Sequence, residues 1–467
     1  MFHACIDYRT KYAHFPDKIY KLHGIVYPSP MKSVKAYRYR YVILLCLVLL
    51  IFSVEIQWLN LAPVGRVTNH FYQGQLALKY ASPVDLLSLM FLLVFVVASI
   101  PSSYLLHRLG PRWAVWIASG CIVFGSLTKW IYLASLPAVL FGQFILALGQ
   151  ALVLTSITEI VSRWFPIRER GMAVGITSAS QYLSLAAVMI LTPLLVATRA
   201  NDPAWGEGFE RMMGIYALVS SILALIPAFL MRENPPTPSS TIQTPKNQSF
   251  RTSFRIMNKN ASLRGLMIIF SIGWGVLMTL FIKVDEISAL LGFNDSNGFL
   301  GISMFAGGMV GAIVLPALSD RYRRRKLFFL FCNVCSIPGI LLLVFCQQIG
   351  AVLLSSEAIA LIGASIVGLS LLASIPIGSQ YAAELGIGIS EEVIQGFLLL
   401  FSQGACAVIL LVSLIATDAY SPMVLSTLAA LLAASMIGST FLKESEMIVT
   451  EEERLKGVIE QEIVHLQ

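Results

Sequence analysis

Charged residues are scarce in this sequence. Only 13% of its 467 residues are Asp, Glu, Lys or Arg and 57% are hydrophobic, whereas soluble globular chains carry about 25% charged residues. This scarcity excludes a string of soluble domains, because water could wet too little of their surface. The net charge of +7 does not indicate a nucleic-acid partner, since the basic residues stand in short clusters between apolar runs, as in the cytoplasmic loops of membrane proteins.

Catalytic and metal-binding motifs are missing as well. The six histidines do not cluster, and the sequence has no G-x-S-x-G, H-E-x-x-H or Walker loop. These absences argue against an enzyme, a metal site, a bound cofactor and an ATP-driven pump. Six of the seven cysteines lie inside apolar runs, where we expect them to pack rather than to take part in redox or metal chemistry.

Long apolar runs make up most of what is present. A helix needs about 20 predominantly apolar residues to cross a bilayer, and twelve runs are long enough. They fall at residues 41–63, 86–106, 113–132, 136–158, 171–195, 212–231, 264–284, 298–318, 327–346, 352–378, 393–416 and 420–442. We therefore predict an all-α membrane protein with twelve transmembrane helices.

The placement of Lys and Arg predicts the orientation of these helices. With the N-terminus in the cytoplasm, 27 of the 33 basic residues fall in cytoplasmic segments, and the opposite orientation would reverse that ratio. Both termini are therefore predicted to be cytoplasmic, in a plasma or inner membrane. We expect a monomer in a lipid bilayer.

A Pro-rich stretch divides the helices into two groups. Residues 232–262 contain four prolines among Ser, Thr and basic residues, which is typical of a flexible linker. Six spans on each side of a basic loop is the arrangement of two-bundle secondary carriers. The predicted segments are a cytoplasmic N-terminal segment 1–40, two six-helix bundles at 41–231 and 263–442, the cytoplasmic linker 232–262 and a cytoplasmic C-terminal helix at 443–467. Met31 opens a run typical of a translation start, so we expect residues 1–30 to be disordered or to precede the native start.

Two short basic loops stand at matching places in the two halves. One runs from Ser103 to Arg112 after the second span, and the other from Pro316 to Lys326 after the eighth. Both resemble the loop signature G-x-x-x-D-R-x-G-R-R/K of the major facilitator superfamily, and in topology the resemblance covers the whole chain. It implies two six-helix bundles and transport by alternating access.

We interpret these loops as candidate conformational latches. An acid and nearby arginines could bind helix ends across the bundle and hold one face closed; alternatively, the basic residues only set the orientation. The first loop has His107 in place of the acid, so a latch there would be weaker or would depend on pH. Acids at the inner ends of the fourth and tenth spans could pair with the arginines. The candidate latch residues are Arg108, Gly110, Arg112, Glu159, Arg163, Asp320, Arg321, Arg324 and Glu384.

Several short blocks resemble a narrower family. The segment from Ile375 to Glu384 contains P-x-G-x-x-x-A-x-E, and Gln57-Trp58 and the run from Ser162 to Phe165 also resemble the feline leukaemia virus subgroup C receptor family. Its members are facilitators of choline and ethanolamine, haem has also been claimed as a substrate, and a relative handles a pyridine vitamin. The resemblance therefore implies a small polar metabolite as substrate.

The same resemblance carries over to individual residues. It implies that the tryptophan of the first span, Trp58, and the glutamines of the fifth and eleventh spans, Gln181 and Gln403, contact the substrate. The choline carriers use a tyrosine in the seventh span, and Phe281 stands there in this sequence.

An acid in the first span is the most unusual residue of the chain. Glu55 lies near the middle of that span, where a lone ionised acid costs about 2.5 kcal/mol or more in hydrocarbon. Trp58 follows three residues later on the same helical face. An acid beside an aromatic ring suits an organic cation, but Glu55 could instead carry a coupling proton, as could His107, or only join helices. Gln57 and Asn60 complete the candidate substrate-binding residues of this helix.

Three functions remain open on the sequence alone. The leading hypothesis is a secondary active or facilitative carrier of a small amine such as choline. The second is a proton-coupled carrier of an organic anion, amino acid, vitamin or haem or iron chelate, and the third is a non-transporting receptor on the same fold. Lys283, Asp285 and Glu286, which crowd the outer end of the seventh span, are either interfacial residues or an outer gate.

Overall fold

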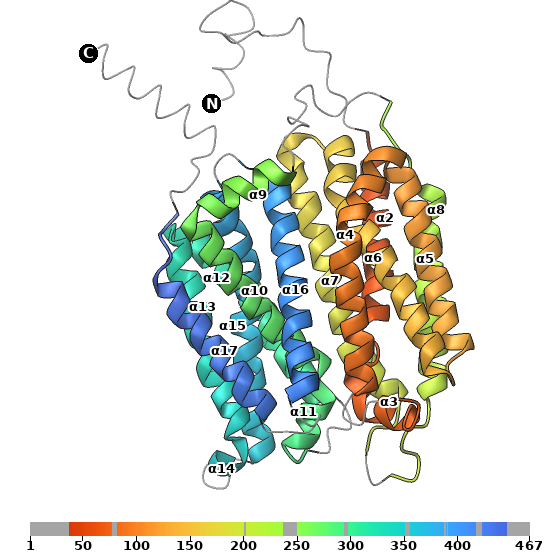
Figure 1. Ribbon diagram of the computed structural model, residues 1–467, viewed down its shortest axis with the longest axis vertical. Helices are drawn as coiled ribbons and strands as arrows, with labels where there is room; N and C mark the ends of the chain where they lie inside the picture. Colours follow the sequence, from red (N-terminus) through yellow and green to blue (C-terminus); the bar gives the residue numbers. More distant parts are fainter. Residues whose placement is uncertain are drawn as a thin grey trace, which may run out of the picture.

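The computed structural model is all-helical over the residues that it describes. These are residues 37–76, 82–199, 202–236, 250–293, 298–350, 355–386, 389, 391–416 and 423–445. The helices run side by side in one elongated bundle (Figure 1). Helix α9 (Phe250–Lys259) lies at one end of the bundle, here called the α9 end, and α11 (Val284–Leu290) lies at the opposite end, the α11 end.

The first half of the chain forms the helices on one side of the bundle. They are α2 (Arg40–Leu59), η1 (Ala62–Val64), α3 (Gly65–Phe71), α4 (Pro83–Leu109), α5 (Pro111–Ile131), α6 (Leu136–Trp164), α7 (Ile167–Leu195) and α8 (Phe209–Leu230). The second half adds α10 (Ala261–Ile282), α12 (Phe299–Tyr322), α13 (Arg325–Val344), α14 (Cys346–Gly350), α15 (Ser356–Leu385), α16 (Glu391–Ala416) and α17 (Met423–Thr440).

Twelve helices of the described residues are long and apolar enough to cross a membrane, which confirms the predicted fold class. The outer surface agrees with this interpretation, because large apolar side chains point away from the protein. Val97, Phe229 and Phe441 are 73%, 72% and 81% exposed. Side chains of this kind are stable on an outer surface when lipid rather than water surrounds it.

Local sequence signals explain where several of these helices begin and end. Ser82 caps α4 by accepting a hydrogen bond from the backbone N–H of Asp85, and Pro83 occupies the first helical position. Gly110 separates α4 from α5 with φ of 85°, a left-handed value that favours glycine. The chain can therefore reverse directly between two long helices.

Each half has its own tightly packed contacts. In the second half α12 lies against α15, and a Cβ atom on Gly307 or Gly311 would overlap the backbone of Ser365 or Leu369. The G-x-x-x-G pair therefore lets two helix backbones approach closely, as small residues do in membrane proteins. Between the halves, α4 packs against α16, α7 against α12, and α3 and η1 against α11.

The described residues cover only part of the predicted terminal segments and linker. Residues 1–36 of the predicted N-terminal segment and 446–467 of the predicted C-terminal helix lie outside the described residues. So do residues 237–249 of the predicted linker. The rest of that linker includes α9. The apolar residues of α9 recur with helical spacing, but the prolines earlier in the linker led to the prediction of a flexible segment.

Candidate functional site

A pocket lies between the two halves of the protein. Its walls come from α2 and α7 of the first half and from α10 of the second, and the cavity open to a water-sized molecule measures about 20 Å³. The lining residues are Glu55, Trp58, Leu59, Gln181, Tyr182, Ser184, Leu185, Trp274 and Met278. Of the predicted substrate residues, the structure thus brings Glu55, Trp58 and Gln181 together.

Glu55 is the charged group of this pocket and is only 4% exposed. Its Oε1 atom accepts two hydrogen bonds, from Nε2 of Gln181 at 2.8 Å and from Nε2 of Gln150 at 2.9 Å. The two amides come from α7 and α6, so the carboxylate joins three helices of the first half. Among the described residues, none donates a hydrogen bond to the other oxygen, Oε2.

Two tryptophans line the pocket beside this carboxylate. The indole of Trp58 stacks on Phe91, with ring centroids 5.5 Å apart and an angle of 10° between the planes. Phe91 therefore covers one face of the Trp58 ring. Trp274 approaches from α10, and the Nε1–H groups of both tryptophans are buried without a hydrogen-bond acceptor among the described residues.

Lys129 on α5 forms a second buried polar cluster, which the sequence interpretation overlooked. Its side chain is fully buried, and Nζ donates to the Gln143 Oε1 atom at 2.8 Å, to the Gln57 backbone oxygen at 2.9 Å and to the Asn60 Oδ1 atom at 3.4 Å. The ammonium thus binds the last turn of α2, next to Trp58. A single lysine inside an apolar span was the available signal.

The remaining predicted substrate residues lie away from the pocket lining. Gln57 and Asn60 belong to the face of α2 that meets Lys129. Phe281 is fully buried one helical turn beyond Met278 on α10, and Gln403 on α16 is buried, with no described partner for its Oε1 atom. Trp274 and Met278 supply the wall from α10 instead.

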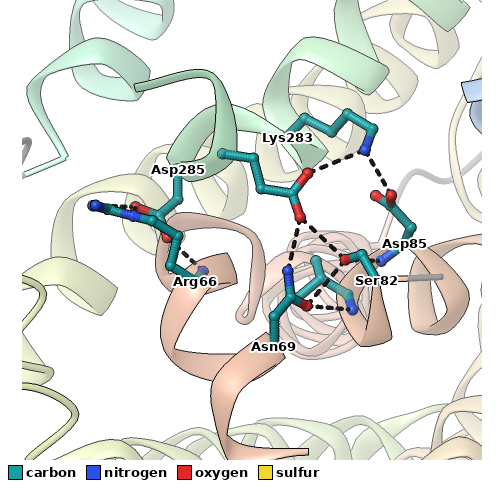
Figure 2. A network of polar contacts seen from close by, with 8 residues as sticks. Arg66, Asn69, Ser82, Asp85, Lys283 and Asp285 are labelled. Atoms are coloured by element: carbon teal, nitrogen blue, oxygen red, sulfur yellow. Dashed lines mark hydrogen bonds and ion pairs between the residues drawn. The ribbon is translucent and has the colours of Figure 1, made fainter. Parts of the chain in front are cut away.

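Ion pairs join the two halves at the α11 end (Figure 2). Arg66 of α3 contacts Asp285 of α11 through Nη2 at 2.8 Å and Nε at 2.9 Å, and its backbone N–H also donates to this carboxylate at 2.7 Å. Burial raises the pKa of the Asp285 carboxyl above its ordinary value, although the charge of Arg66 opposes that rise. A two-point contact with arginine offsets part of the cost of burying the acid.

Lys283 connects two further acids in the same network. Its Nζ atom lies 2.6 Å from the Asp85 Oδ2 atom and 3.1 Å from the Glu286 Oε2 atom. The other oxygen of Glu286 accepts hydrogen bonds from Asn69 at 2.8 Å and from Ser82 at 3.1 Å. Burial lowers the pKa of Lys283, but the carboxylates of Glu286 and Asp85 outweigh that effect, and the net shift is upward.

We call the residues of these contacts the α11-end network: Arg66, Asn69, Ser82, Asp85, Lys283, Asp285 and Glu286. Asp85 is the acid in the first turn of α4. Its pairing with Lys283 was overlooked, because the sequence does not reveal which helices meet.

The second signature loop forms an ion-pair cluster within its own half. Arg325 binds both Asp320 and Glu384, the latter with Nε 3.0 Å from Oε1. Arg321 and Arg324, the arginines singled out from the sequence, are exposed. The reason is local: the chain reverses at Arg323, whose φ is 52°, and this turn directs the next helix, which starts with Arg325, back toward Asp320.

The first signature loop packs against the segment that follows α8. A Cβ atom on Gly110 would lie 2.7 Å from the Glu233 Oε1 atom, and Arg163 binds both Glu159 and Asn234, the latter at 2.9 Å. Arg108 and Arg112 are exposed, and the side chain of His107 lies outside the described part of the chain. These contacts of Glu159 and Arg163 therefore lie within the first half and the segment that follows α8.

No cluster of three or more His, Cys, Asp or Glu residues with metal-binding geometry occurs in the described ranges. The polar groups that line the pocket are one carboxylate, an amide, hydroxyls and indole rings. Groups of these kinds can bind and orient a polar solute.

Known proteins resemble this chain over most of its length. Solute carrier family 49 member A3 of Danio rerio is 28% identical over 416 residues, which are 85% of this chain and 83% of that protein. The choline/ethanolamine transporter flvcr2a of Danio rerio is 25% identical over 79% of each chain. The choline/ethanolamine transporter FLVCR2 of Homo sapiens is 23% identical over 80% of this chain and 72% of its own.

Solved structures share the fold at lower identity. A D-xylose–proton symporter has a TM-score of 0.69 at 13% identity and covers 87% of this chain and 99% of its own. A bacterial homologue of the human lysosomal transporter Spinster, in an inward-facing and unoccupied conformation, has a TM-score of 0.60 at 17% identity, with 87% and 95% covered. A family model described as Major Facilitator Superfamily matches residues 43–390. Because this match spans more than half of a chain with twelve membrane-length helices, the protein belongs to the Major Facilitator Superfamily of membrane transporters.

Proposed function

We propose that this protein moves a small organic cation of the choline and ethanolamine type by alternating access, and that it is a carrier rather than an enzyme. The observation that carries the proposal is the position of Glu55, a buried carboxylate in a pocket between the two halves. The names of the relatives flvcr2a and FLVCR2 as choline/ethanolamine transporters support the same substrate class.

The pocket suits an organic cation for two physical reasons. A buried carboxylate attracts positive charge strongly, because little water is present to screen it. The indole rings of Trp58 and Trp274 add a cation–π contribution of about 2 kcal/mol when the cation is desolvated. Gln181 and Gln150 hold the carboxylate in place through Oε1.

The α11-end network is the proposed gate. Its ion pairs join α3 and α4 of the first half to α10 and α11 of the second, so they stabilise the state in which this end is closed. Breaking them is a requirement for opening this end, as in other transitions that repack interface ion pairs. The distribution of basic residues supports a cytoplasmic α9 end and an external α11 end.

Transport by the purified protein tests this proposal. Protein reconstituted in liposomes is expected to exchange radiolabelled choline or ethanolamine. Glu55→Gln is expected to reduce the initial rate at least about tenfold, because a hydrogen bond to a charged group contributes about 1.5–3 kcal/mol and 1.4 kcal/mol is a factor of ten. The matched control is Glu357→Gln, the same chemical change at an exposed position of α15.

Absence of flux for every amine in a protein that remains folded would contradict the proposal. It would favour a receptor on the carrier fold.

A further inference from the structure

We propose that the first half binds a zwitterionic phospholipid, from the membrane leaflet at the α11 end, in a groove between the end of α7 and the start of α8. The inference concerns a second site and does not depend on the solute that the protein transports. Its basis is the size of this groove, the apolar wall that leads away from its rim, and five charged side chains that line it.

The groove, here called the α7–α8 groove, is a large open cavity. About 1060 Å³ of it is open to water-sized molecules. Its lining comes from residues 193–199, from α8 and the residues directly before it, and from Trp130 of α5. Helices α7 and α8 both pack against α2, and the groove opens between their ends. Small-ligand pockets occupy roughly 300–1,000 Å³, so this cavity has room for a headgroup and the first part of an acyl chain.

The segment between α7 and α8 forms the rim of the groove and is held by its own contacts. The backbone N–H of Ala197 donates to the Glu207 oxygen at 3.0 Å, and the N–H of Gly206 donates to the Ala197 oxygen at 2.8 Å. Trp205 packs edge-on against His70 of α3, with ring centroids 4.9 Å apart. Because α3 contacts α11, the rim lies at the α11 end.

The wall of the groove changes from charged to apolar along α8. Arg211 lies in the first turn of α8, and Ile215 and Leu218 follow at spacings of four and seven residues, on the same helical face. Ile215, Leu218 and Leu194 of α7 are 39%, 48% and 67% exposed. A guanidinium group at the end of a membrane-length helix, followed by an exposed apolar strip, suits a phosphate with an acyl chain attached to it.

Trp130 supports this placement of the membrane surface. It lies in the last turn of α5 and packs over Gly214 of α8, where a Cβ atom would be 2.9 Å from the indole ring. Tryptophan is enriched where the lipid headgroups meet the hydrocarbon. The side chain of Arg211, one turn before Gly214, is therefore at the level of the headgroups, and that of Leu218 is at the level of the acyl chains.

The charged side chains of the groove match a headgroup that carries both signs. Two are positive and three are negative: Arg199, Arg211, Asp202, Glu207 and Glu210. Among the described residues, none of the five forms an ion pair. A zwitterionic headgroup can pair with both kinds, because its phosphate accepts hydrogen bonds from arginine and its ammonium group donates to carboxylates. The excess of one negative charge disfavours an anionic lipid.

Binding of defined lipids to the purified protein tests the inference. Delipidated protein in detergent is titrated with phosphatidylethanolamine, phosphatidylglycerol or glycerophosphoethanolamine, and native mass spectrometry counts the bound molecules. We expect one tightly bound phosphatidylethanolamine and weaker binding of phosphatidylglycerol. Glycerophosphoethanolamine should bind at least about tenfold more weakly than phosphatidylethanolamine, because it has no acyl chain to cover the apolar wall.

Two substitutions connect this binding to the groove. Arg211→Gln is expected to weaken phosphatidylethanolamine binding at least about tenfold, because it removes a charge-assisted contact to the phosphate, and Arg211→Lys should retain part of it. Glu210→Gln should reduce the preference for phosphatidylethanolamine over phosphatidylglycerol. Its matched control is Glu357→Gln, which changes another exposed first-turn glutamate. Glu357 follows α14, which Figure 1 shows at the α11 end, and its substitution should leave the preference unchanged.

Each of four results would overturn the inference. Unchanged phosphatidylethanolamine binding in Arg211→Gln would place the lipid elsewhere on the protein, and tighter binding of phosphatidylglycerol would contradict the match to a zwitterion. Equal binding of glycerophosphoethanolamine would indicate a site for a soluble phosphate ester, and no retained lipid would exclude the site. The groove shares no lining residue with the pocket between the two halves, so none of these results bears on the proposed transport of amines.

Discussion

The Lys283 ammonium donates a hydrogen bond to the Asp85 carboxylate at 2.6 Å, although the two residues are 198 positions apart in the sequence and belong to opposite halves of the protein. Both side chains are only 2% exposed. A pair this deeply buried is strongly coupled, and removing one partner of such a pair typically costs about 3–5 kcal/mol. Because the pKa of Lys283 is raised, its ammonium contributes fully at neutral pH, and the contribution is lost only as the pH rises through that raised pKa.

Lys283→Met is therefore expected to shift the protein toward states that are open at the α11 end. The substitution leaves the carboxylates of Asp85 and Glu286 buried without their cation, so the closed state loses stability. The measurement is the labelling rate of a cysteine introduced at Met278, in the pocket, by a membrane-impermeant maleimide added on the side of the α11 end. We expect the rate to rise several-fold over that of the parent with the same cysteine.

Lys283→Arg serves as the control, because it keeps the positive charge. Its labelling rate should stay closer to that of the parent. Equal labelling of Lys283→Met and the parent would show that this pair does not hold the α11 end closed.

The pair formed by Arg66 and Asp285 offers a test by charge reversal. Arg66→Asp and Asp285→Arg each place like charges together in a buried site, so each is expected to lower transport and the yield of folded protein. The double variant restores opposite charges across the same contact, and partial recovery relative to either single variant is expected. Uptake in liposomes, normalised to folded protein, measures it. Simple addition of the two losses would exclude a direct functional coupling.

Sequence patterns were sufficient for the fold but not for the polar contacts between helices. Twelve membrane-length helices follow from run length alone, because the bilayer fixes a helix length. Glu55 and Trp58 could be placed on one face because their separation is three residues, and both line the pocket. The contacts of Lys283 with Asp85 could not be derived, since they depend on how two distant helices pack.

The second signature loop illustrates the same limit at short range. The sequence placed five basic residues in a row of six, Arg321 to Lys326, and gave no way to decide which of them faces Asp320. One left-handed residue at Arg323 decides the matter, because it reverses the chain and leaves Arg325 beside the acid.

Lys129 is expected to stabilise the first half of the protein. Lys129→Met leaves the oxygens of Gln57, Asn60 and Gln143 without their shared donor, and each unsatisfied buried acceptor costs about 1–3 kcal/mol. We expect a clear fall in the midpoint of thermal unfolding in detergent. Lys259→Met, at an exposed position of α9, should leave the midpoint nearly unchanged.

Lys129 also binds the backbone oxygen of Gln57, next to Trp58. For this reason the surviving folded fraction of Lys129→Met should show a higher KM for amine uptake, with a smaller change in kcat. An unchanged KM would indicate that Lys129 acts on stability alone.

Glu55→Gln decides between a substrate ligand and a proton carrier. The amide has nearly the shape of the carboxyl group but neither ionises nor attracts a cation. If Glu55 binds the ammonium group directly, the variant exchanges amine at least about tenfold more slowly at every pH, because exchange needs no net movement of protons and still requires substrate binding. If Glu55 instead carries a coupling proton, the variant keeps exchange and loses only the pH dependence of net uptake. We expect the first result, because Oε2 of Glu55 receives no hydrogen bond from a described residue and can therefore accept one from an ammonium group. Exchange and net uptake measured in parallel between pH 6 and 8 separate the two mechanisms, with Glu357→Gln as the matched control.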